Sequence, residues 1–283
     1  MDDILRSTLK EEPYISSFGG TYIDIFNGTI IVNTVDFSKV DELRALPQIN
    51  PFINPLHFKP ANNSLIQLKN NFDEIYSLSR IKFAKNLYIL TDMEYNNIVL
   101  YFFDSHDNNT EFLNAVKPFN PIIFYLNGED FTNYNNSKRE IRKKLLGGDG
   151  LYNRASNYIC SAGFWAMNRY EPEPLHGVHI CKSGYTTHFT CGFVKGLNGI
   201  FIRKEYISTD LIVTDLYSEP GDSGGSVMSF VSPQDLNSMV LNGIHVAGGA
   251  GLSVALSIEI IFEVLKESDM RKLVDLVLYL GNS

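Results

Sequence analysis

Short apolar runs separated by polar turns dominate the first half of the chain. Residues 21–32 contain two β-prone runs around Asn27-Gly28, and Asn-Gly tolerates the positive φ angles of a tight hairpin turn. Two helical patterns follow, at residues 40–46 and 65–79. A second pair of β-prone runs lies at residues 87–90 and 98–103. The pattern predicts two related hairpin-plus-helix lobes, hence an α+β unit.

From residue 150 onward, short apolar or alternating runs are separated by Gly, Asn and Ser at close intervals, which is typical of an all-β domain. Residues 192–203 predict two strands joined by a turn at Leu197-Asn198-Gly199. Further strands are expected at residues 211–214 and 226–230, and another where residues 239–241 lead into residues 243–246. Only the tail, residues 258–280, has helical spacing.

A basic run at residues 138–144 separates these halves, and a glycine-rich stretch follows it. A charge run is usually a solvated face, and this one lies where the composition changes, so we expect an exposed, protease-sensitive boundary. The predicted domains are residues 1–143, an α+β unit, and residues 144–283, an all-β domain.

Composition and charge narrow the function classes. The 283 residues are 44% hydrophobic and 20% charged, which excludes global disorder. The net charge of −8 argues against nucleic acid as a partner, because a phosphate-backbone binder needs a basic face. No apolar run approaches the roughly 20 residues of a membrane span. The acidic start, Met1-Asp2-Asp3, leads into no apolar segment, so no secretory signal is visible.

The chain has three cysteines, Cys160, Cys181 and Cys191. This number excludes a disulfide-dense scaffold and leaves at least one thiol without an intramolecular partner. None of the three lies in a C-x-x-C motif, so the sequence gives zinc or redox chemistry no support, and we expect no metal or cofactor.

Residues 219–226, Glu-Pro-Gly-Asp-Ser-Gly-Gly-Ser, carry the strongest chemical signal. A nucleophilic serine needs a tight loop whose backbone N–H groups converge to hold the oxyanion of an acyl-transfer intermediate. Glycines on both sides of Ser223 allow that shape, and a buried Asp222 can lock the loop through charge-assisted bonds. The alternative interpretation is an ordinary Gly-Ser surface turn.

This loop resembles the active-site loop of chymotrypsin-like serine proteases, in the bacterial branch of the streptogrisins and α-lytic protease. Residues 147–164 are similar to the start of the mature enzyme, residues 181–192 to its disulfide-closed hairpin, and residues 245–251 to the strand and loop that line its specificity pocket. The first half of the chain, notably residues 18–24, resembles the family's two-lobed α+β pro-domain, which assists folding of the protease and inhibits it.

The resemblance implies an α+β pro-domain followed by an all-β, chymotrypsin-like (trypsin-like) barrel domain. It places Ser223 as the nucleophile, the N–H groups of Gly221 and Ser223 as the oxyanion hole, and Asp222 as the carboxylate that supports the loop. It also pairs Cys181 with Cys191 in a disulfide. No cofactor or metal is implied, and the partners are a polypeptide substrate or a related protease. Family disulfides suggest an extracellular, oxidising compartment, although no signal peptide is visible.

The sequence departs from the family where the catalytic histidine and aspartate belong. The family's Thr-Ala-Gly-His-Cys and Asn-Asp-type motifs do not occur. Only sixteen residues separate Phe164 from Cys181, whereas the missing strands need on the order of fifty or more. Most of the first barrel is therefore expected to be lacking, together with the partner of Cys160. A true deletion and a gene model that omitted an exon both explain this gap.

Four histidines are candidates for a substitute base: His176, His179, His188 and His245. A general base must lie within hydrogen-bonding distance of the nucleophile and be oriented by a third group. No Asp or Glu placement favours this for any of them, so we interpret them as buried or surface histidines.

Two hypotheses follow. The first is a serine endopeptidase homologue that hydrolyses peptide bonds through Ser223 and is impaired because the triad is incomplete. The second is a catalytically inactive pseudoprotease, or a binding or inhibitory protein based on the pro-domain. The sequence motifs favour the first hypothesis for the protein family that this chain resembles. The missing segment favours the second hypothesis for this chain.

Overall fold

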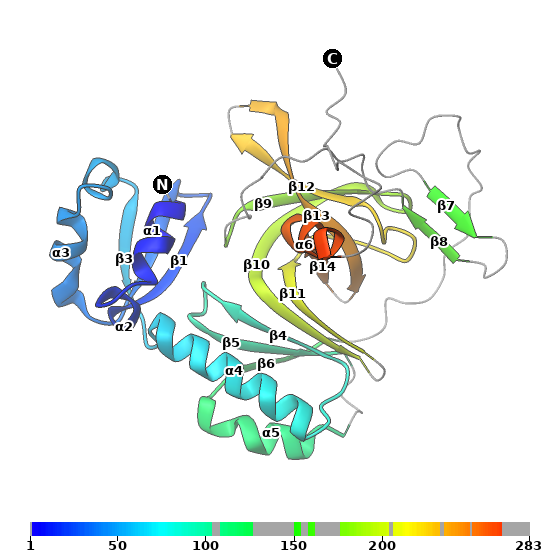
Figure 1. Ribbon diagram of the computed structural model, residues 1–283, viewed down its shortest axis with the longest axis horizontal. Helices are drawn as coiled ribbons and strands as arrows, with labels where there is room; N and C mark the ends of the chain where they lie inside the picture. The colour runs from blue at the N-terminus through cyan, green and yellow to red at the C-terminus, as the bar shows by residue number, and fades with distance from the viewer. Residues whose placement is uncertain are drawn as a thin grey trace. The chain divides into compact units, whose positions relative to one another are not determined.

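The computed structural model describes residues 2–103, 108–126, 150–153, 158–161, 176–203, 206–232, 235–249 and 251–267 (Figure 1). These residues divide into two compact units. Unit 1 comprises the described residues of 1–127, 175–178 and 195–209, and unit 2 comprises those of 128–174, 179–194 and 210–283. Among the described helices, none combines the length and apolar character needed to cross a membrane.

The first lobe of unit 1 is a three-stranded sheet with short helices. The predicted hairpin is confirmed: β1 (Phe18–Asp24) pairs antiparallel with β2 (Thr29–Thr34), and Gly28 in the turn has a φ of +63°. β3 (Leu56–Pro60) runs parallel to β2. The helices are α1 (Asp2–Leu9), α2 (Tyr14–Ser17) and α3 (Val40–Ala45), with 3₁₀ turns at Phe37–Lys39 and Asn50–Phe52. Their apolar side chains form one core cluster that includes Leu5, Phe18, Val32 and Leu43.

The second lobe of unit 1 repeats the hairpin, helix and parallel strand. α4 (Leu65–Ile81) begins with a capping box, in which Ser64 and Gln67 accept each other's backbone N–H groups. It is followed by the hairpin β4 (Leu87–Asp92) and β5 (Asn97–Phe102), then α5 (Thr110–Val116), a 3₁₀ turn (Lys117–Phe119) and β6 (Ile122–Tyr125), parallel to β5. These elements cover the helical and strand patterns of residues 65–79, 87–90 and 98–103, as predicted.

Unit 1 also takes in a late part of the chain. Residues 195–203 belong to β10 (His188–Arg203), and Ile200–Ile202 pair antiparallel with β4. Ile200 and Ile202 lie in the same apolar cluster as Leu87, Ile89 and Ile98. The sheet order within this unit is therefore β10-β4-β5-β6.

Unit 2 is built from antiparallel strands, which confirms the predicted all-β second half. The strands are β9 (His179–Gly184), the first part of β10, β11 (Tyr206–Thr214), β12 (Ser226–Ser232), β13 (Asp235–Gly249) and β14 (Leu252–Ser257). Their order is β11-β14-β13-β12-β9-β10, and β11 also pairs with β10, so the order closes on itself. A separate antiparallel pair is formed by β7 (Gly150–Asn153) and β8 (Tyr158–Ser161), and α6 (Ile258–Glu267) contacts β13 and β14.

The predicted turn at Leu197-Asn198-Gly199 is wrong, because β10 runs through it as one strand of sixteen residues. The Asn198 amide does not bond its own backbone as a turn asparagine does. Its Oδ1 accepts the N–H of Thr91 at 3.2 Å, and its Nδ2 donates to the Thr91 hydroxyl at 3.0 Å. Pairing with β4 thus overrides the local turn preference.

Two sequence predictions lie outside the described residues: the basic boundary run 138–144, and the tail helix beyond Glu267. The division at residues 143 and 144 therefore stays a prediction.

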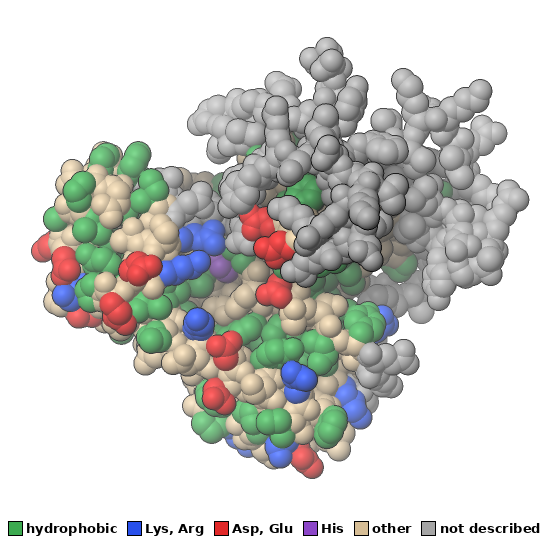
Figure 2. All heavy atoms as spheres, in the orientation of Figure 1, with side chains coloured by type: hydrophobic (Ala, Val, Ile, Leu, Met, Phe, Trp, Pro, Cys, Tyr) green, Lys and Arg blue, Asp and Glu red, His purple; other side chains and the backbone are tan. Residues whose placement is uncertain are grey.

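On the visible face of the space-filling view, acidic and basic side chains of the described residues are interspersed (Figure 2).

Candidate functional site

The serine loop occupies residues 215–225, between β11 and β12. Gly221 and Gly224 flank Asp222 and Ser223 with φ angles of +104° and +90°, values that L side chains rarely adopt. A Cβ on Gly224 would collide with the carbonyl oxygen of Ser161. These two glycines are therefore required by the backbone path of the loop.

Asp222 is fully buried beneath this loop. Its Oδ1 accepts the N–H groups of Thr186 and Thr187 at 2.8 and 2.9 Å. Its Oδ2 accepts the Thr187 hydroxyl at 2.6 Å and the Glu219 N–H at 3.0 Å. The carboxylate thus fastens the loop to the turn between β9 and β10.

Lys182 of β9 also contacts this carboxylate, and no local sequence pattern predicts that contact. Both side chains are fully buried, and Lys182 Nζ lies 2.9 Å from Asp222 Oδ2. Burial raises the pKa of Asp222, but the hydrogen bonds from Thr187, Lys182 and Glu219 outweigh it and hold that pKa below its usual range. Burial lowers the pKa of Lys182, while the hydrogen bond and charge of Asp222 act against that shift.

Ser161 at the end of β8 is a second contact that sequence reasoning did not identify. This buried residue donates its backbone N–H to the carbonyl of Ser223 at 2.6 Å and its hydroxyl to the carbonyl of Gly221 at 2.9 Å. The Tyr185 N–H donates to the same hydroxyl at 2.7 Å. The loop is therefore held from β8 on one side and from the β9–β10 turn on the other.

The Ser223 hydroxyl itself is half-buried and donates to the carbonyl of Val246 at 2.9 Å. The register of β13 and β14 shifts between His245 and Ala247, which places Val246 in a bulge. A carbonyl oxygen accepts this hydrogen bond but does not take the proton, so the bond orients the hydroxyl without activating it.

The backbone N–H groups of residues 221–225 fall into two sets. Those of Asp222, Gly224 and Gly225 donate to carbonyls of Glu219, His245 and Asp222, respectively. Within the described residues, the N–H groups of Gly221 and Ser223 donate to no protein acceptor.

His245 lies in the core behind the loop. Its backbone exchanges hydrogen bonds with Gly224 and Gly225, and its Nδ1 lies 3.0 Å from the Ser253 hydroxyl. Burial, assisted by the positive charge of Lys182, lowers the pKa of His245 to about 4, so the ring is neutral at pH 7.

The other three candidate bases, His176, His179 and His188, also lie in environments of their own. The Nδ1 of His176 is buried in unit 1, and burial together with Arg6 lowers its pKa to about 4. His179 packs against aromatic rings of unit 2, and His188 lies at the β9–β10 hairpin with a φ of +57°. In the part of the chain that the structure describes, none of the four rings is hydrogen-bonded to Ser223 Oγ.

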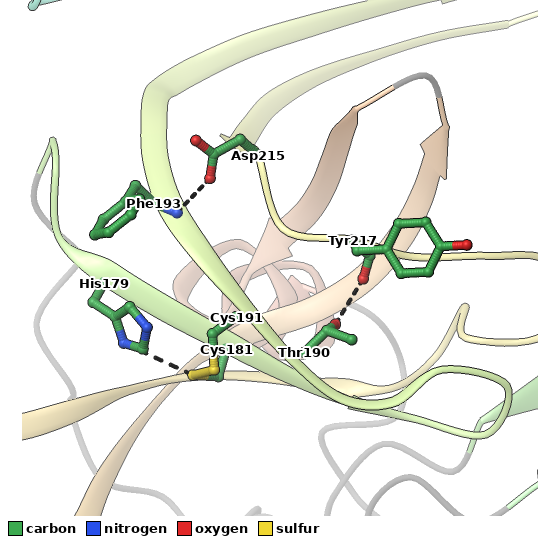
Figure 3. Close-up of a disulfide and its surroundings, with 7 residues drawn as sticks. All are labelled: His179, Cys181, Thr190, Cys191, Phe193, Asp215 and Tyr217. Carbon is green, nitrogen blue, oxygen red and sulfur yellow. Dashed lines mark hydrogen bonds between the residues drawn. A yellow bond between two sulfur atoms is a disulfide. The ribbon is translucent and has the colours of Figure 1, made fainter.

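The predicted disulfide between Cys181 and Cys191 is confirmed (Figure 3). The two residues face each other on β9 and β10, with their Cα atoms 4.0 Å apart. Cys160 lies in β8, and its side chain is outside the described set, so its free state stays a prediction.

Comparisons with known proteins give a short sequence match and structural matches with low TM-scores. No protein-family model matches the chain. Streptogrisin-C of Streptomyces griseus is 37% identical over 62 residues, which are 22% of this chain and 14% of that protein. Protease A of Thermobifida fusca is 18% identical with a TM-score of 0.36, covering 48% of this chain and 99% of the other. Cellulomonas bogoriensis chymotrypsin is 23% identical with a TM-score of 0.31, covering 47% and 63%.

Proposed function

We propose that this chain, a relative of the bacterial chymotrypsin-like serine proteases, is a serine endopeptidase homologue whose peptide-bond hydrolysis is impaired. Ser223 takes the nucleophile's place, the N–H groups of Gly221 and Ser223 take the oxyanion hole, and Asp222 supports the loop. The substrate class is polypeptide. The chain spans only 14% of the length of streptogrisin-C in their match, so the site residues, and not that protein's activity, support this proposal.

Two features support a retained nucleophile loop. The positive φ angles of Gly221 and Gly224, with the buried Asp222, fix its backbone. The N–H groups of Gly221 and Ser223 have no internal acceptor in the described residues, so they are available to a developing oxyanion.

The hydrogen bond of Ser223 carries the proposal of impairment. A serine hydroxyl attacks a carbonyl only when a base removes its proton, and here its hydrogen bond goes to the carbonyl of Val246. Without a triad, enzymes of this design keep only the ~10³–10⁴-fold acceleration over water that the oxyanion hole and binding supply.

A fluorophosphonate probe tests this proposal. The full chain is expected to label far more slowly than streptogrisin-C at pH 7, because the probe needs an activated serine. Rapid labelling that is lost in Ser223→Ala would overturn it, since a base would then exist. Ser7→Ala, which removes an exposed hydroxyl of α1, is the matched control and leaves labelling unchanged. If rapid labelling is seen, loss of labelling in His176→Ala or in His179→Ala would identify the base.

The hydrogen bond from Ser223 to the carbonyl of Val246 also favours a second candidate function. This candidate is a pseudoprotease or a pro-domain-based inhibitor of a related protease. In this case residues 1–143 act as a pro-domain-like unit, and the expected result is inhibition of streptogrisin-C by the full chain. The inhibition is unchanged in Ser223→Ala. Cleavage of the chain by streptogrisin-C without inhibition would exclude this candidate.

A further inference from the structure

Three soft-metal donors meet on one face of the β9–β10 hairpin (Figure 3). The Nδ1 of His179 and the sulfur atoms of Cys181 and Cys191 all lie within 4.8 Å of one another. His179 and Cys181 are two residues apart on β9 and so project from the same face, and Cys191 lies directly opposite Cys181 on β10. Local spacing hides this group, because its members pair across strands instead of forming a C-x-x-C motif.

The strands hold these donors together independently of the disulfide. β9 pairs with β10 over six residue pairs, from Gly184–His188 to His179–Phe193. Its other edge pairs with β12. Cutting the sulfur–sulfur bond therefore leaves the backbones of both cysteines in adjacent strands.

The His179 ring is also fixed in place. It packs edge-on against Phe193, with ring centroids 5.6 Å apart, and stacks on Phe230 at 6.0 Å with an interplanar angle of 10°. This packing keeps Nδ1 3.9 Å from Cys181 Sγ. In a tetrahedral zinc site, Zn–N and Zn–S bonds of about 2.1 and 2.3 Å place nitrogen and sulfur roughly 3.6 Å apart, so a small adjustment suffices.

We propose that reduction of the Cys181–Cys191 disulfide converts this hairpin into a binding site for Zn²⁺ or a similar soft divalent cation. A dithiol reductant gives two electrons and two protons to the disulfide and becomes a disulfide itself, which leaves two protein thiols. Binding of Zn²⁺ then releases those two protons, because thiolates are the ligands. The two sulfur atoms separate from the bonded distance to roughly 3.8 Å, the tetrahedral edge.

The donor set suits this cation by charge and by type. Two thiolates neutralise the two positive charges of Zn²⁺, and thiolate with imidazole is the combination that zinc prefers. Cys191 and His179 are accessible to solvent, whereas Cys181 is buried, so a water molecule completes the fourth position from the exposed side. A disulfide oxidant, such as oxidised dithiothreitol, takes two electrons from the two thiolates and two protons from solvent, which re-forms the protein disulfide and expels the metal.

Cobalt titration tests the proposal in the full chain. The experiment uses a Cys160→Ser background, which removes the third thiol. The protein is reduced with dithiothreitol, freed of it under anaerobic conditions and titrated with Co²⁺. We expect one equivalent to bind with a thiolate-to-cobalt charge-transfer band and tetrahedral d–d bands, and Zn²⁺ to displace it. The oxidised protein shows neither band.

His179→Ala separates this site from adventitious thiol binding. We expect it to weaken Co²⁺ binding at least by the factor of about 10 to 100 that even outer-shell changes cause. His188→Ala removes a histidine of the same hairpin and leaves binding unchanged. Equal binding by His179→Ala, or by the oxidised protein, would overturn the proposal.

Thermal unfolding gives a second readout that does not depend on colour. One equivalent of Zn²⁺ is expected to raise the Tm of the reduced chain, or to restore its folding if reduction unfolds it, and His179→Ala is expected to abolish the gain. No effect of Zn²⁺ on the reduced chain would contradict the site.

Discussion

Lys182 and Asp222 form a fully buried ion pair beneath the serine loop, with Nζ and Oδ2 2.9 Å apart. Asp222 is recognisable from its neighbours in the sequence, because a serine loop needs a supporting carboxylate. Nothing local marks Lys182, because a lysine in a strand ordinarily faces solvent. Its burial follows from the pairing of β9 with both β10 and β12, which is a property of the tertiary fold.

The buried pair makes a quantitative prediction. Asp222→Asn leaves the Lys182 ammonium buried without a counter-charge, so we expect a loss of about 3–5 kcal/mol in the free energy of unfolding, measured by urea denaturation. Glu42→Gln breaks the exposed ion pair with Lys39, whose N–O distance is 2.8 Å, and is expected to leave the free energy of unfolding close to that of the parent, because water screens this pair. Equal losses in the two variants would contradict the role of burial.

Strand β10 shows the same limit at the scale of elements. Hairpins and helices with strong local signals, such as the Asn27-Gly28 turn and the helix capped at Ser64, were predictable from the sequence. The Asn198-Gly199 dipeptide carries a similar turn signal, yet it lies inside a strand. The two dipeptides differ in their partners, because the Asn198 amide bonds to Thr91 on β4. Thr91 is 107 residues away in the sequence, so the local pattern cannot predict this bond.

Asn198→Ala therefore tests the cross-strand bonds. Removal of the amide leaves the N–H of Thr91, a buried residue, without this acceptor, and we expect a loss of about 1–2 kcal/mol in unfolding free energy. Asn62→Ala is the control, because this exposed side chain makes no hydrogen bond with any residue that the structure describes, and it should stay within about 0.5 kcal/mol of the parent. A stability gain in Asn198→Ala would mean that strand propensity, not the amide bonds, dominates.

At the scale of the molecule, each unit contains a histidine that is neutral at pH 7: His176 in unit 1, a partly exposed residue whose Nδ1 is buried, and His245 in unit 2, which is buried. In each, the folded-state pKa is about 4, against an ordinary value of 6.5. The unfolded chain therefore binds protons first as the pH falls. The stability that each site contributes is complete above pH 6.5 and is lost as the pH drops toward 4, by up to about 3 kcal/mol per site.

Urea midpoints at pH 7.0 and pH 4.5 measure this loss. We expect a large fall for the parent chain and a smaller fall for His176→Gln and for His245→Gln. Asn62→Ala, which changes an exposed residue without a titratable side chain, should leave the difference in urea midpoint between the two pH values unaltered. A parent chain equally stable at both pH values would contradict the expectation.

Deletion of the N-terminal half tests the dependence of the second half on the first. Ile200 and Ile202 are only 3% and 4% exposed, and they pack in a cluster supplied by residues 68–116. Removal of that partner exposes both side chains and one edge of β10. We expect residues 145–283 alone to show no cooperative thermal transition by circular dichroism, in contrast to the full chain. A sharp transition in the fragment would refute this.

The late position of β10 in the chain has a consequence during synthesis. The ribosome synthesises β4 long before residues 195–203. In the nascent chain the edge of β4 is therefore unpaired, and Ile89 lacks its contact with Ile200. An unpaired edge with apolar side chains recruits strands from other chains. Translation products that stop between residues 126 and 195 are thus the forms most exposed to aggregation and most dependent on chaperones. Completing the chain removes that exposure, since the protein then supplies the cover for its own edge.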